Sequence, residues 1–198
     1  MKTPSKFQNR EKLLDQGVSL LTERGYHGTG LKEILDAVSI PKGSFYNYFR
    51  SKEDFCAQVV THYIEPFIQQ VEAHLRQPGE NAINAIGQYY NTLIHEQENR
   101  NFQGGCLLGN LMGEIGDTSE LCRQSLNAAV TRYRDSLSRG FERAQEQGDA
   151  RTDINPEAMA DLLLDAWQGA LLRMKIEQSS YPLKRCIQHL LGDYFKKR

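Results

Sequence analysis

The chain has 198 residues with a formal net charge of −1, and 39% of its residues are hydrophobic and 25% charged. This length and balance are typical of a globular protein with a sizeable core. No apolar run approaches the roughly 20 residues that cross a bilayer, and the first residues lack the apolar stretch of a signal peptide. We therefore expect a cytoplasmic protein with no membrane partner.

The charge is unevenly distributed along the chain. Residues 1–52 carry nine Lys and Arg against five Asp and Glu, a net charge of +4, whereas the remaining 146 residues carry a net charge of −5. A basic N-terminal part on an acidic body suits phosphate binding at one end only.

The first predicted elements are two helices. Apolar residues recur with the spacing i, i+3, i+4, i+7 over about 9–24, which predicts a helix that Gly25 ends. The same spacing over 31–38 predicts a second helix of about two turns, with Thr29 near its start as a cap.

A third short helix follows a tight turn. Pro41 cannot extend the second helix, but its fixed φ suits the start of a new one, so we expect a helix from Lys42. Its apolar face carries Phe45, Tyr48 and Phe49. Two short helices joined by a turn over 29–48 have the layout of a helix-turn-helix, whose second helix enters the major groove of DNA. The alternative is a helical hairpin with a solvated polar face.

The outward face of the third helix has the residue types that DNA contact needs. Lys42 can neutralise a phosphate, and Gly43 lets the backbone approach the duplex closely. Ser44 and Tyr46 offer hydroxyls to phosphates, and Tyr46 also offers a ring edge to a thymine methyl. Asn47 suits either an adenine or the DNA backbone.

Helical spacing continues to the end of the chain. Ser51 caps a long helix, and Lys52 at its start is placed to hold a phosphate together with the N-terminal amides of that helix. Pro66 should kink this helix or split it near Glu65. Further helices are expected over about 83–94, after Gly104 and Gly105, over 119–147, over 155–178 and after Pro182. With no alternating-polarity strand visible, the sequence predicts an all-α protein.

The last two predicted helices are apolar over a wide face. The small residues Ala166, Gly169 and Ala170 on this face allow close approach. The helices either bury the face inside one subunit or pack on a second copy in a symmetric four-helix contact. We favour a homodimer formed through these two helices.

Neither the cysteines nor the histidines form a recognisable metal or catalytic motif. The cysteines, at positions 56, 106, 122 and 186, form no C-x-x-C pair and no zinc-like cluster with histidine, and the five histidines lack Glu-x-x-His spacing. Each cysteine is most simply a small buried hydrophobe. We therefore expect no metal, no cofactor and no catalytic residues. A helical thiol-dependent detoxification enzyme and an interaction module that does not bind DNA are the alternatives.

The N-terminal motifs resemble a known family. Gly25-Tyr26, then Gly28-Thr29-Gly30-Leu31-Lys32-Glu33-Ile34, and the block K-G-S-F-Y-x-Y-F-x-S-K-E over residues 42–53 resemble the DNA-binding domain of the TetR family of bacterial repressors. Two positions depart from the usual pattern, because Ser39 stands where glycine is common in the turn and Pro41 stands where a small hydroxyl residue is common.

This resemblance implies the organisation and the partners of the protein. A three-helix helix-turn-helix domain would occupy residues 1–51, and an effector-binding and dimerisation domain would occupy residues 52–198. The partners would be double-stranded operator DNA, a small-molecule effector and a second copy of the chain. The expected DNA-binding residues are Thr29, Lys32, Lys42, Gly43, Ser44, Tyr46, Asn47, Tyr48 and Lys52.

Part of the body resembles one subgroup of the family. The run Gly105-Cys106-Leu107-Leu108-Gly109-Asn110-Leu111, followed by Trp167-Gln168-Gly169-Ala170 and Lys175, is similar to that of TetR repressors that respond to electrophiles such as maleimides, quinones, aldehydes and acrylate. The resemblance implies that Cys106 is a sensing thiol, with Lys175 and Trp167 in the same effector site.

Two interpretations of Cys106 stay open on physical grounds. A thiol at a helix N-terminus after two glycines feels the positive end of the helix dipole, which favours the reactive thiolate. The same run also suits a tightly packed helix start with sulfur as filler. The aromatic residues of the body either line an effector pocket or fill the core, and the core is the simpler assignment.

Overall fold

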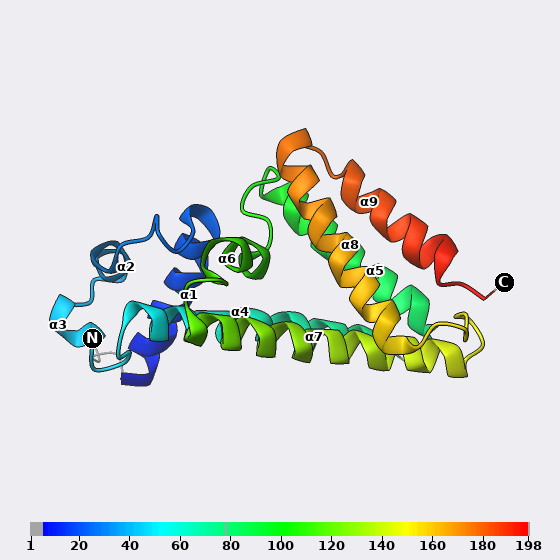
Figure 1. The fold of residues 1–198 in the computed structure, drawn as a ribbon, viewed down its shortest axis with the longest axis horizontal. Coiled ribbons are helices and arrows are strands. Elements are labelled where there is room, and N and C mark those ends of the chain that lie inside the picture. Colours follow the sequence, from blue (N-terminus) through cyan, green and yellow to red (C-terminus); the bar gives the residue numbers. More distant parts are fainter. Residues whose placement is uncertain (1–5, 78, 198) are drawn as a thin grey trace. The chain divides into compact units, whose positions relative to one another are not determined.

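Helices form nearly all of the regular structure. The computed structural model describes residues 6–77 and 79–197, and within these ranges there is no strand, only an isolated bridge between Ala150 and Lys196 (Figure 1). The all-α prediction is confirmed. None of the described helices has the length and apolar character needed to cross a membrane.

The helices follow the predicted order. They are α1 (Lys6–Arg24), α2 (Leu31–Ala37), α3 (Lys42–Phe45), α4 (Lys52–Leu75), α5 (Ala82–Asn99), α6 (Leu107–Ile115), α7 (Glu120–Glu146), α8 (Pro156–Glu177) and α9 (Tyr181–Ile187), followed by a π-helical segment (Gln188–Tyr194). The last predicted helix is thus α-helical only in its first half.

Local signals set most of the helix ends. Gly25 and Gly148 both have a left-handed φ, of 71° and 77°, directly after α1 and shortly after α7. The side chain of Asn155 accepts a hydrogen bond from the backbone N–H of Ala158 at 2.7 Å, and the Ser51 hydroxyl accepts one from Asp54 at 3.1 Å. These are the bonds that N-cap residues make.

Pro66 does not split the helix that contains it. Helix α4 runs from Lys52 to Leu75 with Pro66 inside, so the predicted split near Glu65 is wrong, and the alternative of a kink stays a prediction. Pro66 is exposed, and a solvent-facing side of a helix tolerates the loss of one backbone hydrogen bond because water can take its place.

The contacts divide the chain into two compact units. The first unit comprises Met1–Glu65 and Cys106–Ala129, and the second comprises Pro66–Gly105 and Val130–Arg198. Helix α6 therefore belongs to the same unit as the N-terminal helices, and it contacts α1. The functional boundary between residues 51 and 52 stays a prediction.

Each unit has an aromatic centre. In the first unit, the ring centroids of Phe49 and Phe55 lie 4.9 Å apart, and an added Cβ at Gly17 would lie 2.5 Å from the Phe55 ring, so α1 and α4 approach closely. In the second unit, α8 and α9 pack side by side and α5 contacts α9 (Figure 1). There the hydroxyls of Tyr89 and Tyr133, both buried, lie 2.6 Å apart.

Candidate functional site

The short helix α3 is fixed by two phenylalanines. Phe45 and Phe49 are each 1% exposed, and their ring centroids lie 5.6 and 4.9 Å from that of Phe55 at the start of α4. Because these two rings point inward, the residues between them point outward. Tyr46 is 60% exposed, and Asn47 is exposed as well.

The predicted DNA-binding residues near α3 form an accessible surface. Nothing lies within 4 Å of an added Cβ at Gly43, so the backbone there is open to a large ligand. Lys32 on α2 is exposed, whereas Ser44 and Tyr48 are half-buried. The side chain of Lys42 lies outside the described residues.

Thr29 does not belong to this surface. Its side chain is fully buried, and its hydroxyl donates to the backbone carbonyls of Gly25 at 2.7 Å and Leu20 at 3.3 Å. Gly30 is the N-cap residue of α2. The prediction of Thr29 as a cap of α2 is therefore wrong. Its hydroxyl holds the end of α1, and a contact of Thr29 with DNA stays a prediction.

Lys52, predicted to bind a DNA phosphate, also has a partner within the protein. Its ammonium donates to the backbone carbonyl of Tyr26 and lies 4.1 Å from the centroid of the Tyr26 ring. Burial lowers the pKa of Lys52. The residue thus holds the turn after α1, and its contact with a phosphate stays a prediction.

The turn before α3 contains a left-handed residue. Ser39 has φ of 56°, a conformation in which glycine is favoured and side chains with a branched Cβ are strongly disfavoured. We expect Ser39→Val to lower the free energy of unfolding by about 1–2 kcal/mol and Ser39→Gly to leave it unchanged or raise it slightly. Urea denaturation measures both, and equal stability of the two variants would contradict the assigned geometry.

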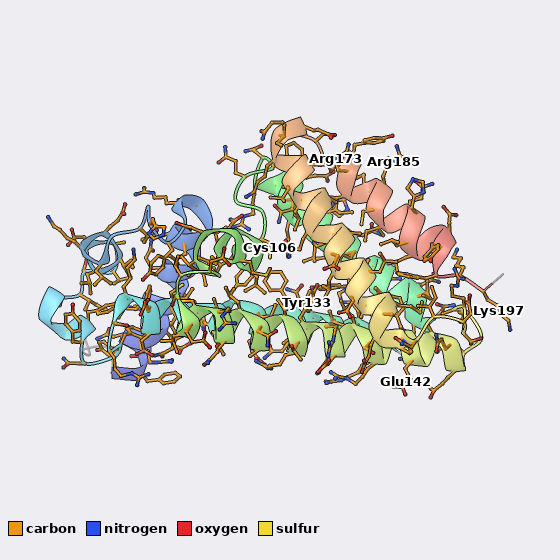
Figure 2. All side chains as sticks on the ribbon, in the orientation of Figure 1. Cys106, Tyr133, Glu142, Arg173, Arg185 and Lys197 are labelled. Atoms are coloured by element: carbon orange, nitrogen blue, oxygen red, sulfur yellow. The ribbon has the colours of Figure 1, made fainter. Side chains whose placement is uncertain are left out.

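Cys106 is the N-cap residue of α6 (Figure 2). Its side chain is half-buried, and its sulfur receives a hydrogen bond from the hydroxyl of Tyr63 on α4, with a Sγ–Oη distance of 3.8 Å. Sulfur is a weak acceptor, so this bond is a weak one. Sequence reasoning missed Tyr63, because its helical spacing marked it only as part of an apolar face.

The two other predicted effector residues lie in the second unit. Trp167 on α8 is 5% exposed, and its ring packs edge-on against Tyr90 with centroids 4.8 Å apart. Lys175 lies against Gly105, where an added Cβ would be 2.5 Å from Lys175 Cε. Because Cys106 belongs to the first unit and Lys175 to the second, the predicted proximity of the two side chains stays a prediction.

Two of the other three cysteines are less accessible than Cys106. Cys56 and Cys122 are fully buried and hydrogen-bonded to each other, and this bond together with burial raises the pKa of Cys56. Burial raises the pKa of Cys186 to about 11. Among the described residues, no group of three or more His, Cys, Asp and Glu side chains is placed to hold a metal ion.

Comparison with known families decides the identity of this fold. Residues 13–59 match the family described as bacterial regulatory proteins, tetR family, and residues 82–190 match the tetracyclin repressor-like C-terminal domain. The chain belongs to the TetR family. It is a DNA-binding transcriptional regulator whose N-terminal part carries the helix-turn-helix.

This TetR-family chain is similar to known repressors over most of its own length and of theirs. It is 33% identical to the HTH-type transcriptional repressor DhaR of Mycobacterium sp. (strain GP1), covering 88% of this chain and 86% of DhaR. It is 31% identical to the HTH-type transcriptional repressor NemR of Escherichia coli (strain K12), covering 96% of each chain. The crystal structure of reduced E. coli NemR superposes with a TM-score of 0.87, covering 96% of this chain and 97% of that one.

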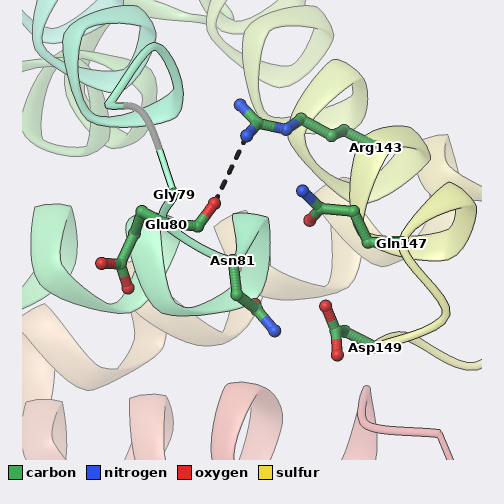
Figure 3. Close-up of a pocket in the computed structure, with 6 residues that line it drawn as sticks. All are labelled: Gly79, Glu80, Asn81, Arg143, Gln147 and Asp149. Atoms are coloured by element: carbon green, nitrogen blue, oxygen red, sulfur yellow. Dashed lines mark hydrogen bonds between the residues drawn. The ribbon is translucent and has the colours of Figure 1, made fainter.

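One polar pocket of this TetR-family chain is lined by side chains that form hydrogen bonds with backbone groups at helix ends. The pocket, about 300 Å³ in volume, lies at the start of α5 (Figure 3). Arg143 donates to the backbone carbonyls of Leu75 and Glu80, and Gln147 accepts from the backbone N–H of Ala82 at 2.9 Å. These groups join α4, α5 and α7, which explains their polarity without a ligand.

Proposed function

We propose that this TetR-family chain is a homodimeric repressor that binds operator DNA through α3 and is released by a small-molecule effector. The observation that carries the proposal is the outward side of α3 and of the turn that follows it. Gly43 on α3 is open, and its C-cap Tyr46 and the next residue Asn47 are exposed, whereas Phe45 and Phe49 are buried. A recognition helix needs this arrangement, with polar groups toward the groove and aromatic groups toward its own domain.

The roles of the contacts follow from their chemistry. Tyr46 and Asn47 meet base edges or the sugar–phosphate backbone, and Lys32, Lys42 and Lys52 neutralise phosphates. Ser44 and Tyr48, which are half-buried, are proposed to offer their hydroxyls to phosphates. Phosphate contacts make the affinity fall steeply with salt, whereas base contacts set the sequence preference.

The second copy of the chain packs on the outer face of α8. Ile176 is 85% exposed and Leu172 60%, one helical turn apart, and an added Cβ at Gly169 would meet nothing within 4 Å. Exposed apolar groups of this size beside an open glycine support a helix–helix contact with another subunit. Tyr181, at the start of α9, is exposed as well.

We expect Ile176→Glu to convert the dimer to a monomer. In a symmetric interface the substitution buries two unpaired carboxylates, which should raise the dimer dissociation constant at least about 100-fold. Sedimentation velocity measures the oligomeric state. The control is Leu121→Glu, which replaces an exposed apolar residue on α7. Unchanged association of Ile176→Glu would remove this face from the interface.

The effector acts on Cys106 in the same proposal. For an electrophile with an activated alkene, the sulfur adds to the carbon–carbon double bond, so that an S–C bond forms, the π bond breaks and the thiol proton is transferred to the adjacent carbon. Release requires that the adduct favours a conformation that does not bind DNA.

Binding to the DNA that flanks its own gene tests the proposal directly. We expect a retarded band in an electrophoretic mobility assay at physiological salt, in the presence of excess unrelated duplex. A homodimer that binds a palindrome should protect two half-sites about one helical turn apart. Absence of any shift at low salt would contradict the proposal.

A further inference from the structure

Helix α6 is attached to the end of α1 by polar side chains. The carboxylate of Glu114 accepts hydrogen bonds from two consecutive backbone amides, that of Tyr26 at 2.7 Å and that of His27 at 2.6 Å. Asn110, one turn earlier on α6, donates from its side-chain amide to the backbone carbonyl of Thr22 at 3.3 Å. One face of α6 thus holds both the last turn of α1 and the residues that follow it.

The backbone of the α1–α2 turn is shaped to receive this carboxylate. Gly25 has φ of 71°, which ends α1 and turns the next two amides out of the helix. An added Cβ at Gly25 would lie 2.4 Å from Glu114 Oε2, so only glycine permits the approach. Hydrogen bonds from neutral donors to a carboxylate are stronger than those to a neutral acceptor.

The same turn is held from its other side by α4. The ammonium of Lys52 donates to the carbonyl of Tyr26, whose amide binds Glu114. Tyr26 is therefore fixed by an anion on its N–H and by a cation on its C=O. Helix α2 begins five residues later, at Leu31, and leads directly into the turn before α3.

We propose that Glu114 couples the position of α6 to the orientation of the helix-turn-helix. Cys106 is the N-cap of α6 and Glu114 lies near its C-terminal end, so a displacement of the cysteine end of this short helix moves the carboxylate. In the DNA-binding state Glu114 holds the amides of Tyr26 and His27, and the effector-bound state releases them. This inference rests on the proposed function, to which it adds the positioning residue that transmits the signal.

The test compares Glu114→Gln with the wild type, using N-ethylmaleimide as the probe. The glutamine side chain keeps the size but accepts only one of the two amides. The matched control is Asp117→Asn, which removes the same charge from an exposed carboxylate just after α6. Peptide mass spectrometry measures the fraction of Cys106 modified, and fluorescence anisotropy measures operator affinity before and after treatment.

We expect equal modification of Cys106 in all three proteins but different consequences. The maleimide should weaken operator binding of the wild type and of Asp117→Asn to the same extent. In Glu114→Gln, untreated protein should already bind weakly, and the additional effect of the maleimide should be at least about tenfold smaller. A wild-type response in Glu114→Gln, or an equally reduced response in Asp117→Asn, would overturn the proposal.

Amide hydrogen exchange supplies a readout that needs neither operator nor variant. In the wild type, the amides of Tyr26 and His27 should exchange slowly, and modification of Cys106 should accelerate both. Unchanged exchange after full modification would overturn the proposal even where DNA release is observed. Conversely, accelerated exchange in a protein that does not bind the operator would refute the proposed function and leave the coupling intact.

Discussion

Replacing Tyr46 with alanine is expected to weaken operator binding at least about 30-fold, because each lost contact to DNA costs about 1–3 kcal/mol and a dimer loses two. The side chain is 60% exposed and touches Phe45 only edge-on, with ring centroids 5.5 Å apart. Its removal therefore leaves the aromatic centre of the first unit in place. The dimer and the thermal unfolding transition should be unchanged.

Fluorescence anisotropy at physiological salt measures the operator affinity of Tyr46→Ala. Tyr46→Phe separates the two possible contributions, since it keeps the ring edge and removes the hydroxyl. Leu121→Ala truncates another exposed side chain of the same unit and should bind as the wild type does. If Tyr46→Ala binds the operator with wild-type affinity, the placement of α3 in the groove is refuted.

Replacing Cys106 with serine is expected to abolish the response to N-ethylmaleimide without changing operator affinity in its absence. The sulfur of Cys106 is half-buried, whereas Cys56 and Cys122 are fully buried. One equivalent of reagent should therefore react first at Cys106. We expect the wild type to lose at least about tenfold in operator affinity, which corresponds to about 1.4 kcal/mol, and Cys106→Ser to lose none.

Cys186→Ser is the matched control for the thiol experiment. Cys186 is half-buried like Cys106, and burial raises its pKa to about 11, which keeps it as the unreactive thiol at neutral pH. This variant should respond as the wild type does. Equal sensitivity of wild type and Cys106→Ser would eliminate the covalent mechanism and leave a noncovalent effector.

Features set by neighbouring residues were predictable from the sequence. Gly25 and Gly148 end helices because glycine occupies the left-handed conformation at little cost, and Asn155 begins one because its side chain satisfies a free amide. The inward position of Phe45 and the outward position of Tyr46 followed from helical periodicity alone.

Features set by distant residues were not predictable. Thr29 has a hydroxyl that suits a phosphate, and only the fold shows that it donates to the backbone carbonyls of Leu20 and Gly25, at the end of α1 and directly after it. Glu114 lies 88 residues from the amide that it binds, and a half-buried carboxylate on a short helix has no spacing signal. The split predicted at Pro66 was wrong for a related reason, because the effect of a proline depends on which side of the helix faces solvent.

In the proposed function, the segment beginning at Lys42 reads a DNA groove. Photo-crosslinking tests it most directly, with p-benzoylphenylalanine in place of the exposed Asn47 and operator DNA labelled on either strand. We expect crosslinks to bases at two positions about 10 base pairs apart, one in each half-site. Crosslinks confined to the protein itself, with the operator still bound, would contradict it.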